Sequence, residues 1–203
     1  MQERLVNILD VLYSDKHNPR QLNAENEKSL KKMFETFECE KNEEIETFLK
    51  RDAIEFAKQR ISITNLVLET GNGDKTRLLG YFTLANKPIQ INAASMSGTK
   101  RRRLQRCAAE SEQKNIFNVS SMLIAQLGKN SAVKNNPLTG ELLLGSALAL
   151  LASVQRVVGG GIVFLECEQR EKLMQFYGRN DFFKFGERSS SEGKNYFQLL
   201  KFL

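Results

Sequence analysis

The stretch of residues 121–177 constrains the fold most strongly, because it reads as strand, loop, helix, strand and helix. Two apolar runs, residues 121–128 and 161–167, have the length and bounding residues of buried strands. The apolar run 142–154 between them has helical length, and the turn sequence KNNPLTGE, residues 134–141, precedes it. A loop that ends at a helix N-terminus presents free backbone N–H groups. The stretch therefore predicts an α/β fold with an anion-binding loop.

The rest of the chain adds helices and strands around this stretch. Apolar spacing predicts helices over residues 1–12, 27–37 and 43–57, and alternation predicts strands over residues 61–70, 76–85 and 89–91. The C-terminal end runs through residues 182–186 and a Ser/Gly turn to a last strand over residues 196–203. Asn42 is expected to cap the third helix, and the turn Gly71–Asp74 to close an antiparallel hairpin. Residues 92–118 read as a polar, mostly helical insertion. The order predicts a mixed, mostly antiparallel sheet flanked by helices.

The predicted organisation is a single domain over residues 31–203, preceded by an accessory helical segment over residues 1–30. The 203 residues, 41% of them hydrophobic, are enough to bury one core. The final predicted strand is expected to be exposed, so it could pair with a second subunit and form a homodimer.

Cysteine and histidine usage excludes several chemistries. Three dispersed cysteines, Cys39, Cys107 and Cys167, favour reduced thiols and a cytoplasmic location. No CxxC or HxxxH spacing occurs, so no metal site is expected, and His17 lies in a turn-like sequence. The sequence also lacks the GxSxG, P-loop and GxGxxG motifs, which argues against hydrolase, nucleoside triphosphatase and dinucleotide oxidoreductase activities.

No targeting or membrane segment is expected. The first 12 residues lack the apolar core and cleavage site of a signal peptide. The longest apolar run, residues 142–158, is interrupted by Gly145, Ser146, Ser153 and Arg156, and reads as a buried amphipathic helix.

The net charge of +6 predicts an anionic partner, which could be nucleic acid, the phosphates of coenzyme A or an acidic protein surface. The basic residues cluster in the run KRRRLQR at 100–106, which contains Lys100, Arg101, Arg102, Arg103 and Arg106. A solvated helical face is the usual fate of such a run. The alternatives are a clamp for a CoA phosphate and a contact surface for nucleic acid.

Five phrases in a consistent order carry a resemblance to a known family: FLKRDAIEF, GYFTLAN, IAQLGKN, LTGELL and FLECEQREKLMQFY. Together they resemble the GNAT superfamily of N-acetyltransferases, in particular a bacterial branch similar to acetylating toxins. The resemblance covers the chain from Phe37 onwards. It implies the GNAT fold and acetyl-CoA as cosubstrate, without a metal.

The resemblance assigns the cosubstrate residues to the central strand and the loop after it. Leu127, Gly128 and Lys129 match the strand that splays from its neighbour and binds the acetyl and pantetheine groups. The loop that binds the pyrophosphate matches the segment with Asn136, Leu138, Thr139, Gly140 and Glu141. Pro137 and Thr139 replace glycines of the family pattern, and Pro137 has no N–H to donate. Thr139 could also cap the helix.

The resemblance assigns a general acid to Tyr177, which matches the tyrosine that protonates the departing CoA thiolate. Asp181 stands where the family usually has glycine, so an unusual backbone conformation is expected there. The alternative reading of Tyr177 is a half-buried packing residue.

The residues around the second core strand offer candidates for the general base. Glu166 and Glu168 end this strand on one face and could accept the proton of the attacking amine. The alternative is that one carboxylate is solvated and the other caps a helix. Cys167 points to the opposite face and is expected in the core.

The function implied is acetyl transfer from acetyl-CoA to a primary amine by direct attack. The acceptor could be a small molecule, a protein or an aminoacyl-tRNA, and a toxin-type enzyme would imply an antitoxin partner. The alternative is a GNAT-fold binding module with little or no affinity for CoA, which the residues Pro137 and Thr139 favour.

Overall fold

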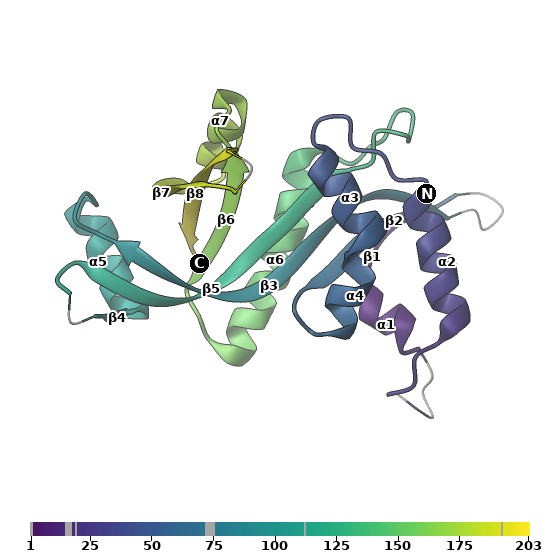
Figure 1. The fold of residues 1–203 in the computed structure, drawn as a ribbon, viewed down its shortest axis with the longest axis horizontal. Helices are drawn as coiled ribbons and strands as arrows, with labels where there is room; N and C mark the ends of the chain where they lie inside the picture. The colour runs from purple at the N-terminus through teal and green to yellow at the C-terminus, as the bar shows by residue number, and fades with distance from the viewer. Residues whose placement is uncertain (1, 15–17, 19, 72–75, 112, 192) are drawn as a thin grey trace. The chain divides into compact units, whose positions relative to one another are not determined.

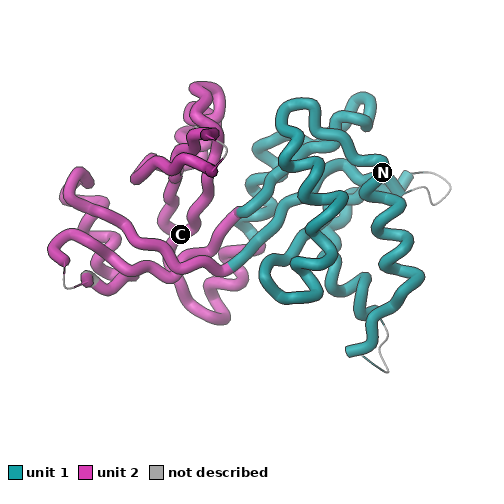
Figure 2. Tube along the Cα trace, viewed as in Figure 1, with its two compact units in different colours: residues 1–85, 125–149 teal, residues 86–124, 150–203 magenta. Residues whose placement is uncertain are grey.

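The computed structural model describes residues 2–14, 18, 20–71, 76–111, 113–191 and 193–203. They form two compact units (Figure 2). Unit 1 contains Met1–Ala85 and Ala125–Ala149, and unit 2 contains Asn86–Ile124 and Leu150–Leu203.

The helices and strands are labelled in Figure 1. The helices are α1 (Ile8–Leu12), α2 (Ala24–Glu35), α3 (Glu43–Arg51), α4 (Ala53–Lys58), α5 (Gly98–Cys107), α6 (Gly140–Val158) and α7 (Glu171–Arg179). The strands are β1 (Gln2–Asn7), β2 (Ile63–Thr70), β3 (Thr76–Asn92), β4 (Ala109–Glu110), β5 (Ile116–Lys129), β6 (Ile162–Glu168), β7 (Phe183–Ser189) and β8 (Asn195–Phe202).

The strands form one sheet in the order β1-β2-β3-β5-β6-β8-β7, with β4 paired to β5. The pair β5–β6 is parallel, whereas β1–β2, β2–β3, β4–β5, β6–β8 and β7–β8 are antiparallel. The predicted mixed, mostly antiparallel α/β sheet is therefore confirmed.

The N-terminal segment of unit 1 differs from the prediction. A helix over residues 1–12 is wrong for its first half, where β1 pairs antiparallel with β2. The apolar spacing of the first 12 residues fits a helix. Pairing along the edge of β2, however, satisfies the backbone hydrogen-bonding groups of both strands, and this stabilisation outweighs the local preference for a helix. The chain becomes helical at Ile8, where the Asn7 side chain accepts a hydrogen bond from the Leu9 N–H at 2.8 Å.

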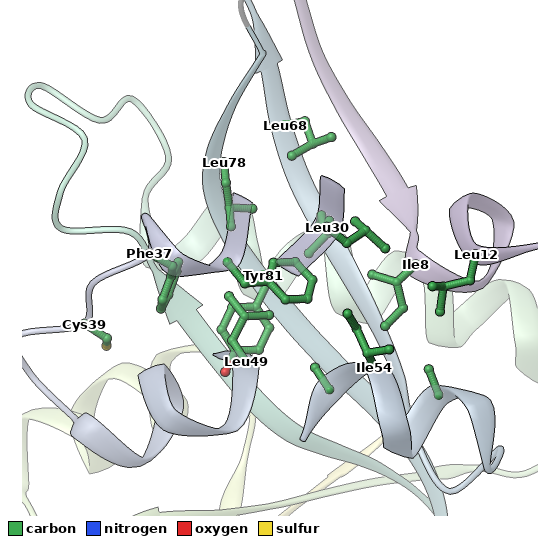
Figure 3. Packing of buried hydrophobic residues seen from close by; sticks show 14 residues of the cluster. Ile8, Leu12, Leu30, Phe37, Cys39, Leu49, Ile54, Leu68, Leu78 and Tyr81 are labelled. Carbon is green, nitrogen blue, oxygen red and sulfur yellow. The ribbon is translucent and has the colours of Figure 1, made fainter. Parts of the chain in front are cut away.

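The core of unit 1 lies between helices α1–α4 and strands β2 and β3. Figure 3 shows Ile8, Leu30 and Leu49 from three of these helices gathered around Tyr81 of β3. Asn42 caps α3 as predicted, since its side chain accepts from the Glu44 N–H at 2.9 Å. The predicted single helix over 43–57 is divided at Asp52, which ends α3 and begins α4.

The predicted hairpin of unit 1 is confirmed by the antiparallel register of β2 and β3, which shifts once, between Val67 and Leu68. Three of its four predicted turn residues, at positions 72–74, lie outside the described residues, as does His17. Strand β3 is longer than predicted and includes residues 89–91.

In unit 2 the final strand β8 lies between β6 and β7. The predicted exposed final strand is therefore wrong, and β7 ends the strand order instead. The antiparallel β7–β8 hairpin turns back so that β8 hydrogen-bonds on both sides. A second core, with Leu104 of α5, Phe117 of β5 and Leu200 of β8, fills this unit.

Helix α6 buries one stripe, formed by Leu143, Leu144, Ala147 and Leu151, as expected of an amphipathic helix. Other apolar residues on it, among them Val157, are exposed. By length and composition alone it is also apolar enough to cross a membrane, and 22% of that apolar window is buried.

Candidate functional site

The predicted site residues fall into two groups. The cosubstrate candidates lie in unit 1, whereas Tyr177, Glu166 and Glu168 lie in unit 2. The parallel pairing of β5 with β6 joins Met122 to Val163 and Leu123 to Phe164.

Two asparagine side chains hold the loop between β5 and α6. The buried Asn130 donates to the carbonyl of Leu78 at 2.8 Å and accepts from the N–H groups of Glu38 and Ala132. Asn136 donates to the carbonyls of Leu79 and Asn130, each at 2.8 Å. These bonds tie the loop to β3, so its backbone has one defined course.

Asn135 and Leu138 set the course of the backbone in this loop. Asn135 adopts a left-handed conformation with φ 52°, which asparagine tolerates better than most residues. The N–H of Leu138 donates to the Asn136 side chain at 3.0 Å, and its own side chain is buried. Leu138 therefore anchors the loop, and its amide is already engaged.

The amides at the start of α6 are available for a ligand. Thr139 caps the helix as expected, since its hydroxyl accepts from the Leu142 N–H at 3.1 Å. The N–H groups of Thr139, Gly140 and Glu141 have no acceptor among the described residues. Free amides at a helix N-terminus, with the positive end of the helix dipole, suit a phosphate group.

The end of β5 is shaped by packing against α3. A Cβ atom on Gly128 would lie 2.4 Å from Cγ2 of Ile45 and 3.3 Å from the Phe37 ring, so glycine is required for this contact. Leu127 is half-buried, and Lys129 Nζ donates to the carbonyl of Asn136 at 3.0 Å. Lys129 thus supports the loop through its side chain.

In unit 2, Tyr177 is buried, with 8% of its surface exposed. Its ring makes edge contacts with Phe176 and Phe182, and no described residue hydrogen-bonds to its hydroxyl. Burial raises the pKa of Tyr177 well above its ordinary value, and the neighbouring Cys167 adds to this shift. The phenol is therefore protonated at neutral pH and can donate its proton. The expected unusual backbone at Asp181 is present, with φ 63°.

Glu166 is held in a polar cluster of unit 2. Its carboxylate accepts from Arg188 Nε at 2.9 Å and from Gln198 Nε2 at 2.9 Å. Burial by itself would raise its pKa, but these hydrogen bonds and the charges of Arg188 and Lys87 outweigh that effect and lower the pKa. A low pKa makes this carboxylate a weak base.

Glu168 pairs with Arg170 at 2.5 Å. The Cys167 between the two glutamates is buried as predicted, and burial raises its pKa to about 11. Side chains alternate along a strand, so both glutamates lie on the face of β6 opposite to Cys167.

Sequence reasoning missed Asn130, which organises the loop together with Asn136. An asparagine directly after a strand is typical of a turn, and this signal was present in the phrase IAQLGKN. Among the described residues, no group of three or more His, Cys, Asp or Glu side chains could hold a metal ion.

No protein-family model matches the sequence, and no curated protein matches it. Solved structures do match. A tyrosine-to-phenylalanine mutant of KacT is 20% identical, with 97% of this chain and 94% of that chain covered and a TM-score of 0.62. AtaT complexed with acetyl-methionyl-tRNAfMet is 17% identical over 97% and 94% of the two chains, with a TM-score of 0.63.

A tyrosine-to-phenylalanine mutant of the AtaT toxin, bound to the C-terminus of the antitoxin AtaR and to acetyl-CoA, is 18% identical. The match covers 80% of this chain and 82% of the AtaT chain, with a TM-score of 0.52. These neighbours are toxin acetyltransferases of the GNAT fold, and the chain has that fold, as the resemblance predicted.

Proposed function

We propose that this protein transfers an acetyl group from acetyl-CoA to a primary amine. The observation that carries the proposal is the loop before α6, where the amides of Thr139, Gly140 and Glu141 lack acceptors among the described residues. The GNAT fold and the acetyl-CoA bound to the AtaT neighbour support the same cosubstrate.

The loop would hold the pyrophosphate through these three amides, because charge-assisted hydrogen bonds to backbone N–H groups are strong. Pro137 has no N–H to donate, and the Leu138 amide is engaged by Asn136. The donors therefore come from the helix start rather than from a glycine-rich loop. Leu127, Gly128 and Lys129 would bind the acetyl and pantetheine part through their backbone.

In the chemical step, the amine nitrogen attacks the thioester carbonyl and the C–S bond breaks. The Tyr177 hydroxyl donates a hydrogen bond and then its proton to the departing thiolate, and the tyrosinate takes a proton back from water. A thiol pKa of about 8.5 means that the leaving group needs only modest assistance. Of the two candidate bases, Glu168 has the more exposed side chain, 26% against 16% for Glu166, and can pass the amine proton to water.

The acceptor we favour is the aminoacyl group of a charged tRNA. Unit 2 has 15 basic and 8 acidic residues, whereas unit 1 has 15 and 16, so the excess positive charge belongs to unit 2. The AtaT neighbour was solved with an acetylated aminoacyl-tRNA, which is the product of such a transfer. A charged tRNA would place the protein in the cytoplasm, and a toxin of this type would be held inactive by an antitoxin.

A thermal-shift titration with acetyl-CoA tests the cosubstrate. A ligand at about 100 times its Kd stabilises the native state by roughly 2.7 kcal/mol. The expected result is a dose-dependent rise in Tm. No shift at millimolar acetyl-CoA would leave the non-enzymatic binding module as the function.

A translation extract tests the acceptor. With acetyl-CoA present, the wild-type protein is expected to stop protein synthesis, and the extract without acetyl-CoA is the control. Undiminished synthesis would exclude charged tRNA and return the choice to a small amine or a protein.

A further inference from the structure

The basic run of residues 100–106 forms α5, whose two faces have different surroundings. Leu104 is fully buried in the core of unit 2. On the same side, Lys100 Nζ lies 3.8 Å from the centre of the Phe183 ring, and the Arg103 guanidinium lies 4.6 Å from that of Phe202. Cations over aromatic rings are attracted to them, so these two side chains help to hold α5 on the sheet.

Arg102 and Arg106 occupy the other face of α5. Both are exposed, and with 3.6 residues per turn they lie four residues apart on one side, away from Leu104. Neither forms an ion pair with any residue that the structure describes. Arg101 lies at the side of the helix and makes a contact of its own. The free positive charge of α5 is thus concentrated in one arginine pair.

The charge around this pair is also positive. Helix α5 has five basic residues and no acidic one, within a unit whose net charge is +7. An arginine guanidinium binds phosphate with two parallel hydrogen bonds in a fixed plane, so arginine is over-represented where phosphates are recognised. Phosphates of a nucleic-acid strand suit this face, and the proposed tRNA acceptor would supply them.

We propose that Arg102 and Arg106 bind the phosphate backbone of the acceptor nucleic acid, whereas Lys100 and Arg103 hold α5 in place. This inference rests on the proposed tRNA acceptor and assigns its contact surface. It separates a run of basic residues, uniform in the sequence, into two binding residues and two packing residues.

The test measures binding of deacylated bulk tRNA by fluorescence anisotropy between about 50 and 200 mM KCl. Each phosphate contact contributes about 0.7–0.9 to the slope of log K against log salt. The double variant Arg102→Gln/Arg106→Gln is therefore expected to flatten the slope by about 1.4–1.8. If affinity at 1 M salt is unchanged, its binding at 0.1 M falls by about 25- to 60-fold.

The matched control is Lys28→Gln/Lys32→Gln, an exposed pair with the same spacing on α2 of unit 1. It removes the same charge and is expected to keep the wild-type slope. The variant Lys100→Gln/Arg103→Gln is expected to lower the Tm, whereas Arg102→Gln/Arg106→Gln leaves it unchanged. An unchanged slope in the Arg102/Arg106 variant, or an equal loss in the α2 control, overturns the inference.

A polyglutamate competitor distinguishes the other anionic partner. If polyglutamate displaces tRNA and its own binding depends on Arg102 and Arg106 to the same degree, the surface binds acidic protein and the inference is wrong. Acetyl-CoA binding is read separately from the thermal shift. If acetyl-CoA does not raise the Tm but tRNA still binds with the expected salt dependence, the proposed enzymatic function is rejected, and the assignment of Arg102 and Arg106 as phosphate-binding residues still holds.

Discussion

The side-chain nitrogen of Asn136 lies 2.8 Å from the carbonyl oxygen of Leu79, and this hydrogen bond fixes the loop before α6 to strand β3. The same nitrogen donates to the carbonyl of Asn130, and the side-chain oxygen accepts from the N–H of Leu138. One side chain thus sets the backbone that presents the free amides of α6.

Replacing Asn136 by alanine is expected to destabilise the protein by about 2 kcal/mol, because buried groups that lose a hydrogen-bond partner cost about 1–3 kcal/mol. Urea unfolding measures the change. The control is Asn135→Gly, since glycine readily adopts the positive φ of that residue. A loss below about 0.5 kcal/mol for Asn136→Ala would show that the loop does not depend on these bonds.

Replacing Gly140 by proline is expected to weaken acetyl-CoA binding without disrupting α6. Proline is favoured at the first position of a helix, where its missing N–H costs no helical bond. The change removes one proposed phosphate donor, and hydrogen bonds to charged groups contribute about 1.5–3 kcal/mol, so the Kd should rise by at least about 10-fold. Calorimetric titration measures the Kd, and Gly140→Ala, which keeps the N–H, is the control. Equal affinity in both variants would remove Gly140 from the site.

Replacing Tyr177 by phenylalanine is expected to reduce kcat by about 10²-fold, the lower end of general-acid contributions. The edge contacts with Phe176 and Phe182 involve the ring, which the variant keeps. The Tm of the variant, and the rise in Tm that acetyl-CoA causes, should therefore match those of the wild type. Wild-type turnover on the native acceptor would identify Tyr177 as a packing residue only.

The pH profile of the wild-type enzyme should show no loss of activity from ionisation of Tyr177 up to about pH 10. Burial raises the pKa of this phenol, so the proton donor stays protonated beyond the ordinary value of 10.0. Stopped-flow measurement of kcat against pH checks this. A fall of kcat near pH 9–10 that is absent from the residual activity of Tyr177→Phe would contradict the raised pKa.

Replacing Glu166 by glutamine is expected to destabilise unit 2 by about 1 kcal/mol at neutral pH, a small value because the Arg188 side chain is 45% exposed. The folded-state pKa of Glu166 is lowered, so its stabilising effect is present above the ordinary value of 4.5 and is lost as the pH falls through the lowered value. Urea unfolding at neutral and acidic pH should therefore show a difference that shrinks in acid. The exposed Glu40→Gln is the control, and a difference that is constant with pH would argue against the ion pair.

Much of the fold and part of the candidate site could be predicted from the sequence, because local patterns carry that information. The apolar periods of α3 and α6, the Asn42 cap and the strands β5 and β6 follow from residues within a few positions of each other. The cap at Thr139 and the left-handed Asp181 were predicted for the same reason, since both depend on one short backbone segment.

The rest depended on contacts between residues far apart in the sequence. The first strand forms because β2 offers an unpaired edge, and β8 lies inside the sheet because the last hairpin folds back. Glu166 is tied to Arg188 and Gln198, which a strand pattern cannot show. The basic run of α5 divides into packing and free residues only because Phe183 and Phe202 arrive from the C-terminal strands. Sequence determined most of the helical and extended segments and the position of the charged run, and tertiary packing decided the first strand and which of those charges remain free for a partner.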